Sequence, residues 1–203
     1  MPIAKESGGN FVPAPAGTHV ARCIGVISLG TLPRGDSAFL PTYKIMIQWE
    51  LPDEPVEIEG GKSCMVISKE YSLSIGKKSN LCRDLVGWRG QEFTEEERKG
   101  FEVAKVLDKP CMLSVIHATS NKGSVYAKIT GISKLPKTVT CPARVHDLIH
   151  YELESGRDAT FQKLPEWVRK KIETCEEWLH PAIHEEEPAA APVNDSTEDD
   201  VPF

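Results

Sequence analysis

Basic and aromatic side chains alternate in two segments that have the period of β-strands. Lys69 and Tyr71 lie two residues apart in one segment, and Tyr126 and Lys128 repeat this spacing in another. Because alternate residues of a strand point to the same face, each pair would place a ring and a cation side by side. Rings that stack on bases and cations that contact phosphates are what binding of an unpaired polynucleotide requires.

Further basic residues precede or follow these pairs, on the polar face of a second strand, around a short helix and at a hairpin tip. The candidate contact residues are Lys44, Lys69, Tyr71, Lys77, Lys78, Arg83, Arg89, Lys122, Tyr126 and Lys128. Tyr126 is the strongest candidate ring, because the opposite face of its strand already supplies apolar residues. Tyr71 is weaker, since its face also carries apolar residues, and lysines cover most protein surfaces.

Apolar patterns explain the other large rings. Tyr43 and Trp49 share the apolar face of one strand, and Trp88 completes a helical stripe with Leu81 and Leu85. We expect these three rings in the core.

Residue types that could support catalysis or bind a metal are sparse. His146 and His150 are spaced i, i+4, as are His180 and His184, but no cysteine or carboxylate set accompanies them and Pro181 interrupts the second pair. The carboxylate runs at 95–97 and 176–177 are typical of solvated helix faces. Phosphate-binding, dinucleotide-binding and metalloprotease motifs are absent from the sequence. We therefore expect no enzymatic activity, no metal and no cofactor.

The bulk composition indicates one compact domain with appendages. The chain has 203 residues, of which 40% are hydrophobic, and no run approaches the length of a membrane span. Residues 1–10 lack the apolar core of a signal peptide, so a cytoplasmic location is expected. The six cysteines show no CxxC spacing and are expected to be reduced, mostly packed thiols.

The negative charge is concentrated at the carboxyl end. Seven of the 30 acidic residues, and none of the 24 basic residues, lie after His184. The remaining body carries 23 acids against 24 bases, a net charge of +1. The body can therefore carry a local basic surface although the chain as a whole is acidic.

Hydrophobic periodicity predicts an ordered series of elements. Strands are expected at 19–29 (with a bulge at Gly25), 43–51, 64–73, 111–118 and 124–132, and 52–62 is expected to be a loop. A helix should follow Ser79 and end before Gly90, and Thr94 with Glu97 forms a capping-box pattern. Five strands with a helix between the third and fourth predict the OB-fold, a mainly β Greek-key barrel, although a generic α+β domain has the same order.

The expected organisation has four parts: a lead-in at 1–17, the OB-fold domain at 18–136, an extension at 137–180 and a disordered acidic tail at 181–203. Within the extension, a stripe follows Pro165 at the spacing of an amphipathic helix. The residues of the stripe are Leu164, Val168, Ile172, Cys175 and Leu179. This helix is expected to pack on the barrel or its own loop, or else to contact a partner.

The segment 198–203 consists of three acids followed by Val201, Pro202 and Phe203. It can be a frayed solvated tail, but acids could also steer an apolar tip into a partner's pocket. The segment closely resembles the partner-docking tail of bacterial-type single-stranded-DNA-binding proteins. The candidate partner-binding residues are Asp199, Asp200, Val201, Pro202 and Phe203.

Several longer segments resemble a family of bacteriophage-encoded single-stranded-DNA-binding proteins with an OB-fold. The segments lie at 11–31, 43–52, 66–97, 109–137 and 160–173, and the most specific one contains SKEYSLSIGKKSNL and WRG. The insert at 32–41 and Cys82 depart from this resemblance. The resemblance implies sequence-tolerant coating of single-stranded DNA during phage replication or recombination, in the host cytoplasm. The tail would recruit replication or repair proteins, and self-association is left open.

Two other functions remain open at this point. One is an interaction module that mimics the host protein's tail and captures host replication factors without binding DNA. The other is a small metal-dependent nuclease that uses the histidine pairs.

Overall fold

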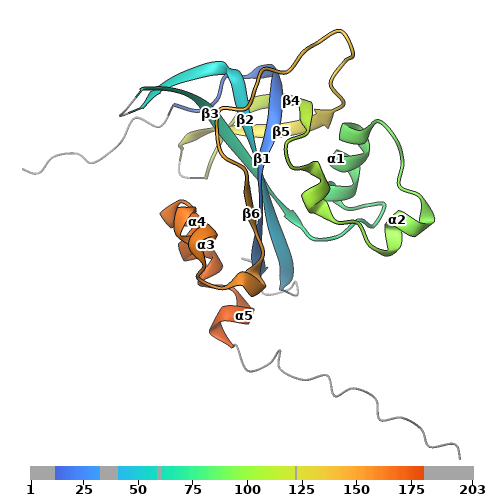
Figure 1. The fold of residues 1–203 in the computed structure, drawn as a ribbon, viewed down its shortest axis with the longest axis vertical. Coiled ribbons are helices and arrows are strands. Elements are labelled where there is room, and N and C mark those ends of the chain that lie inside the picture. The colour runs from blue at the N-terminus through green and yellow to red at the C-terminus, as the bar shows by residue number, and fades with distance from the viewer. Residues whose placement is uncertain (1–11, 33–40, 59–60, 122, 181–203) are drawn as a thin grey trace, which may run out of the picture.

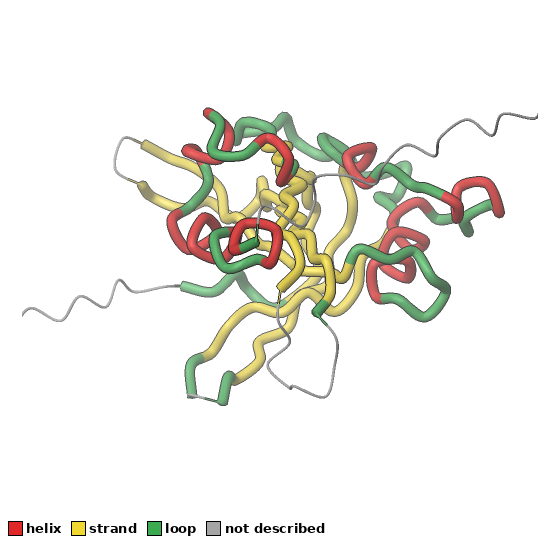
Figure 2. The backbone as a smooth tube through the Cα atoms, turned by 90° about the horizontal axis from the view of Figure 1, so that it is seen from below, coloured by secondary structure: helices red, strands yellow, loops and turns green. Residues whose placement is uncertain are grey.

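The computed structural model describes residues 12–32, 41–58, 61–121 and 123–180. The strands are β1 (Gly17–Leu32), β2 (Thr42–Ile58), β3 (Gly61–Ser72), β4 (Pro110–Thr119), β5 (Val125–Ser133) and β6 (Ile149–Tyr151). The helices are α1 (Asn80–Arg89), α2 (Glu95–Lys99), α3 (Ala159–Lys163), α4 (Glu166–Ile172) and α5 (Glu176–Leu179), with 3-10 turns at Val103–Val106 and Leu153–Ser155. The protein is mainly β, with short helices on both sides of the strands (Figures 1 and 2).

The strands form one sheet in the order β3-β2-β1-β4-β5, with antiparallel neighbours, and β6 pairs with β1 in parallel. The predominance of strands confirms the mainly β prediction, and α1 lies between the third and fourth strands along the chain as expected. No strand pairing joins β3 to β5 within the described ranges, so the sheet is open there. A register shift between Cys23 and Gly25 is the bulge expected at Gly25.

Helix α1 begins and ends at the residues that the sequence indicates. The Ser79 side chain accepts a hydrogen bond from the Cys82 N–H at 3.1 Å, and Gly90 ends the helix with a φ of 69°. The Thr94 and Glu97 capping box opens α2. No helix in the described part of the chain is long and apolar enough to cross a membrane.

The main core lies between one face of the sheet and α1. Trp49 of β2 and Trp88 of α1 are both buried, with their ring centroids 5.8 Å apart. These two rings lie in the core as predicted, and Tyr43 packs against it partly buried.

A second core lies on the other face of β1 and β2. Ile27 and Met46 pack there against Phe161, Val168 and Ile172 of the carboxyl-terminal helices. Fully burying each apolar side chain of this size stabilises the fold by about 1.5–3 kcal/mol. Of the roles expected for the extension, the structure therefore shows packing of its helices on the sheet.

Two expectations about elements were wrong. The segment 52–62 is mostly strand, because β2 and β3 continue as a hairpin beyond the register shift between Leu51 and Pro55. The stripe of the extension is divided between α4 and α5, because Cys175 has extended backbone angles and its side chain is buried against β1. Gly30 of β1 makes room for it, since a Cβ at this residue would lie 2.6 Å from the Cβ of Cys175.

Candidate nucleic-acid interface

A hollow of about 420 Å³ opens where the edges of β3 and β5 meet the start of α4. We call it the sheet groove. It is lined by Val12, Ala14, Gln48, Met65, Val66, Ile67, Ser68, Tyr126, Ala127, Pro165 and Trp167. Two of its rings are exposed: Tyr126 is 41% exposed and Trp167 is 53% exposed. The groove therefore has an apolar lining and two flat side chains available to a ligand.

The strand and the helix place the two rings by their periodicity. On β5, Ala127 and Ile129 turn toward the core, so Tyr126 and Lys128 turn outward. On α4, Val168 and Ile172 are fully buried against the sheet, which leaves Trp167 on the exposed side. Both rings are held by elements whose opposite faces are packed.

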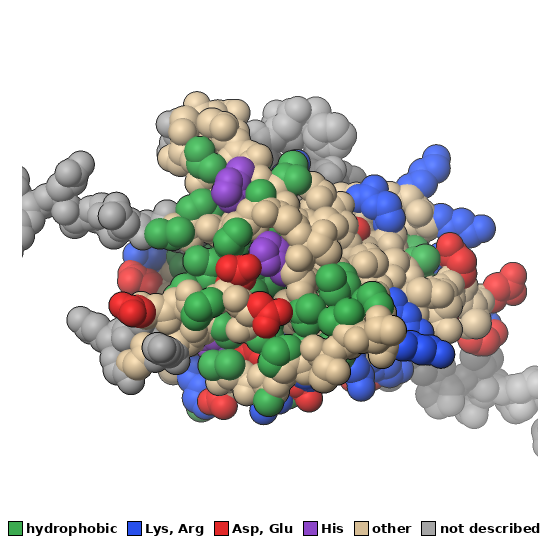
Figure 3. Space-filling model, turned by 90° about the horizontal axis from the view of Figure 1, so that it is seen from above, with side chains coloured by type: hydrophobic (Ala, Val, Ile, Leu, Met, Phe, Trp, Pro, Cys, Tyr) green, Lys and Arg blue, Asp and Glu red, His purple; other side chains and the backbone are tan. Residues whose placement is uncertain are grey.

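Basic side chains gather at the junction of β3 and α1. Lys77, Lys78 and Arg83 line one hollow of about 770 Å³, and Lys44 shares an adjoining hollow of about 300 Å³ with Lys78. We call these four residues the basic corner. In Figure 3, Lys and Arg side chains are prominent on the side of the molecule where α1 and α2 lie. No ion pair joins Lys44, Lys77 or Lys78 to an acid of the described ranges, although Glu92 and Glu95 also line the larger hollow.

A buried carboxylate fixes α1 beneath the basic corner. Asp84 is 5% exposed and accepts hydrogen bonds from Lys69 Nζ at 2.6 Å and from the Tyr71 hydroxyl at 2.9 Å. Burial, together with the Asp84 charge, raises the pKa of Tyr71 well above its usual range. Lys69 and Tyr71 therefore attach α1 to β3.

This arrangement corrects two of the predicted contacts. Tyr71 is only 3% exposed, so its ring has no free face for a base. The Lys69 ammonium is neutralised by Asp84. Sequence alternation placed them on one face correctly, but that face is the one that packs against α1.

Arg89 is also engaged within the fold. Its guanidinium forms an ion pair with Glu97 and lies 4.4 Å from the centroid of the Phe93 ring. With 19% of its side chain exposed, it contributes mainly to the packing of α2 on α1. Lys122 and the tail residues Asp199–Phe203 lie outside the described residues.

The outer face of β3 connects the sheet groove to the basic corner. Ser68 lines the groove and Ser72 lines the smaller basic hollow, four residues or about 13 Å further along the strand. Glu70 lies between them, and Lys171 of α4 forms an ion pair with its carboxylate. The one acid on this path is thus already neutralised.

Trp167 was missed as a site residue by sequence reasoning. The available signal was its position, since it falls between Leu164 and Val168 but off the apolar stripe that these residues begin. A large ring off the buried stripe of an amphipathic helix faces solvent, and this makes it a candidate for contact with a ligand.

The sheet groove and the basic corner offer different kinds of contact to a ligand. None of the described residues that line the sheet groove is a carboxylate, a histidine or a lysine, and its polar side chains are those of Gln48, Ser68 and Tyr126 together with the indole of Trp167. Its lining supplies stacking and apolar contact, and the basic corner supplies positive charge. Comparison of the chain with protein-family models and with curated proteins gives no match.

Proposed function

We propose that this protein binds single-stranded DNA with little sequence preference, using the sheet groove for bases and the basic corner for phosphates. The observation that carries the proposal is the pair of exposed rings, Tyr126 and Trp167, on one groove. Stacking of a base on such a ring is worth about 1–3 kcal/mol and is tolerant of base identity. Lys128, on the outward face of β5, and the basic corner would supply the phosphate contacts.

The proposal includes the assignment of the sheet to the OB-fold. The strand topology supports this assignment. The sheet order β3-β2-β1-β4-β5, with α1 between β3 and β4 along the chain, is compatible with a Greek-key OB barrel left open between its third and fifth strands. In OB-folds the face of the second and third strands binds oligonucleotides. Gln48 and Ser68, which line the sheet groove, come from these two strands.

The acidic segment 198–203 is the proposed docking element for replication or repair proteins. Its acids would also compete with DNA for the basic corner, because they carry the same charge as phosphates. Deleting 198–203 should abolish partner recruitment and leave the affinity for DNA equal or higher. A large loss of DNA affinity on this deletion would contradict the division of roles.

Tryptophan emission tests the proposal directly. Trp49 and Trp88 are buried and Trp178 packs on Phe161, whereas Trp167 is more than half exposed. Oligo-dT should therefore quench the emission, and most of the quenching should be lost in Trp167→Phe.

Alanine variants measured by anisotropy of a labelled oligo-dT provide the second readout. Tyr126→Ala and Trp167→Ala should each weaken binding by about 5- to 150-fold, the equivalent of one lost stack. Leu179→Ala, which removes an apolar side chain of α5 that is 59% exposed and lies outside the groove, is the control. Unchanged affinity in both ring variants would refute the groove as the site. No binding of oligo-dT by the wild type would favour the interaction module instead.

A further inference from the structure

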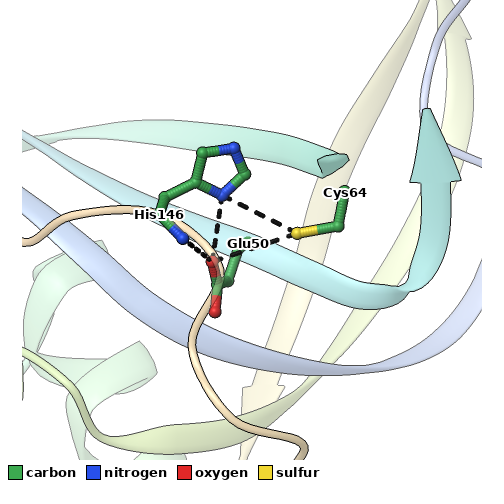
Figure 4. Close-up of side chains that lie close together, drawn as sticks. All are labelled: Glu50, Cys64 and His146. Atoms are coloured by element: carbon green, nitrogen blue, oxygen red, sulfur yellow. Dashed lines mark hydrogen bonds and ion pairs between the residues drawn. The ribbon is translucent and has the colours of Figure 1, made fainter. Parts of the chain in front are cut away.

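Three side chains with metal-binding atoms meet at the far end of the β2–β3 hairpin, away from the basic corner. Glu50 comes from β2, Cys64 from β3 and His146 from the segment that precedes β6 (Figure 4). Glu50 is 0% exposed, Cys64 is 4% exposed, and 30% of the His146 side chain reaches solvent. The group is thus buried on two sides and open on one.

The three potential ligand atoms form a compact triangle. The distance from His146 Nδ1 to Glu50 Oε2 is 2.9 Å, that from His146 Nδ1 to Cys64 Sγ is 3.7 Å, and that from Cys64 Sγ to Glu50 Oε2 is 3.9 Å. Tetrahedral zinc with ordinary bond lengths would separate the same atom pairs by about 3.3, 3.6 and 3.5 Å. Shifts of about 0.4 Å or less would convert the triangle into one face of a zinc tetrahedron.

The charges and the surroundings also suit a divalent cation. One carboxylate and one thiolate would together balance the ion's two positive charges, which limits the cost of burying them. The far nitrogen of the imidazole, Nε2, lies 2.9 Å from Ser63 Oγ. Such a hydrogen bond on the second ring nitrogen orients a metal-bound histidine.

We propose that Glu50, Cys64 and His146 bind one zinc ion, with water in the fourth position on the open side. Binding releases the Cys64 thiol proton to solvent, and neutral His146 then carries its proton on Nε2, facing Ser63. The Glu50 carboxylate also accepts hydrogen bonds from the Val145 and His146 backbone N–H groups at 3.1 and 2.9 Å. These bonds already hold the segment 134–148, which lies between β5 and β6, against the sheet.

Zinc would therefore join β2, β3 and this connecting segment at one point. The inference is independent of DNA binding, because the three residues line neither the sheet groove nor the hollows of the basic corner. The hydrogen-bonded group without metal is the competing explanation, and the experiment distinguishes the two.

The test uses the full chain, stripped with a chelator and dialysed, with zinc chloride titrated by calorimetry. We expect one zinc ion per chain with a micromolar or lower Kd, and a higher melting temperature when zinc is present. Cobalt(II) in place of zinc should give the near-ultraviolet charge-transfer band of a thiolate ligand together with the visible bands of tetrahedral cobalt.

Two conservative variants assign the site. Cys64→Ser and His146→Gln should each weaken zinc binding at least about tenfold, and Cys64→Ser should remove the charge-transfer band. Cys141→Ser, at a half-buried thiol outside the triangle, and His150→Gln, at an exposed histidine, are the matched controls and should bind as the wild type does. Circular dichroism of each variant verifies folding. Wild-type protein that binds no zinc, or a Cys64→Ser protein that binds zinc as tightly as the wild type does, would overturn the proposal.

Discussion

Replacing Asp84 by alanine tests how the basic corner is held. The carboxylate is 5% exposed and is the shared acceptor for Lys69 and Tyr71. Its removal leaves the buried Tyr71 hydroxyl without a partner, which costs about 1–3 kcal/mol. It also removes the ion pair with Lys69, whose loss is discounted because 21% of the lysine side chain is exposed.

Together these losses predict a decrease of about 2–4 kcal/mol in the free energy of unfolding. For a protein of this size that corresponds to a melting temperature about 5–15 °C lower. Urea unfolding followed by tryptophan emission measures the first quantity, and thermal unfolding by circular dichroism measures the second. Because Asp84 also fixes the helix that carries Arg83, the affinity for oligo-dT should decrease as well.

A double-mutant cycle with Tyr71→Phe makes this prediction specific. Tyr71→Phe alone should cost only about 1 kcal/mol, since the carboxylate keeps Lys69 as a partner. Asp84→Ala should then cost less in the Tyr71→Phe background than in the wild type, because no buried hydroxyl is left without an acceptor. Strictly additive costs, or an Asp84→Ala variant within about 0.5 kcal/mol of the wild type, would refute the reasoning.

Three further predictions concern charge, pH and packing. If five side chains contact phosphates, the logarithm of the DNA association constant should fall with the logarithm of salt at a slope of about −3.5, about 100-fold between 50 and 200 mM. The double variant Lys77→Ala/Lys78→Ala should have a shallower slope of about −2, whereas the control Lys105→Ala should keep the wild-type slope. An affinity that does not depend on salt would refute the phosphate contacts. Desolvation raises the pKa of Glu177, but the hydrogen bonds that it accepts from the hydroxyl and backbone N–H of residue 31 outweigh this effect and lower the pKa. The resulting stabilisation is present above the unfolded-state pKa of about 4.3 and is lost as the pH falls through the lower folded-state value. Glu177→Gln should therefore be less stable than the wild type at pH 7 in urea unfolding, and the difference should shrink toward pH 3; a difference independent of pH would contradict it. Gly30→Ala should cost about 2–4 kcal/mol, because φ is +76° there and the new methyl group would overlap the side chain of residue 175. A Gly30→Ala protein that melts as the wild type does would contradict both the backbone strain and the steric overlap on which this prediction rests.

Sequence patterns were sufficient where short-range chemistry decides the structure. Ser79 and Gly90 mark the ends of α1, and the bulge at Gly25 follows from glycine within a strand. The burial of Trp49 and Trp88 follows from the stripes to which they belong. In each case the residues that determine the feature belong to the same helix or strand as the feature itself, or lie directly beside it in the sequence.

Tertiary contacts decided the features that sequence reasoning missed. Prolines and acids in 52–62 are typical of a loop, but pairing between β2 and β3 outweighs that preference. Packing of Cys175 against Gly30 interrupts an apolar stripe that is continuous in sequence. The pattern could not show that Tyr71 faces a buried carboxylate, because the partner belongs to a helix 13 residues further along.

Tertiary contacts also create the candidate metal site, which sequence reasoning did not find. Its three residues are 14 and 82 positions apart along the chain, and none belongs to a paired motif. His146 was considered only with His150, whose ring forms an ion pair with Glu152 instead. Only the folded sheet brings the histidine to Glu50 and Cys64.

Because β1 and β2 are buried on both faces, the choice of where to truncate the protein affects its stability and solubility. A fragment that stops at residue 136 would expose Ile27, Leu29 and Met46, which α3, α4 and β6 cover in the intact protein. An exposed apolar surface of this kind promotes aggregation of the expressed fragment. The segment 137–180 therefore completes the second core, and shortened versions intended for crystals or binding assays should retain it.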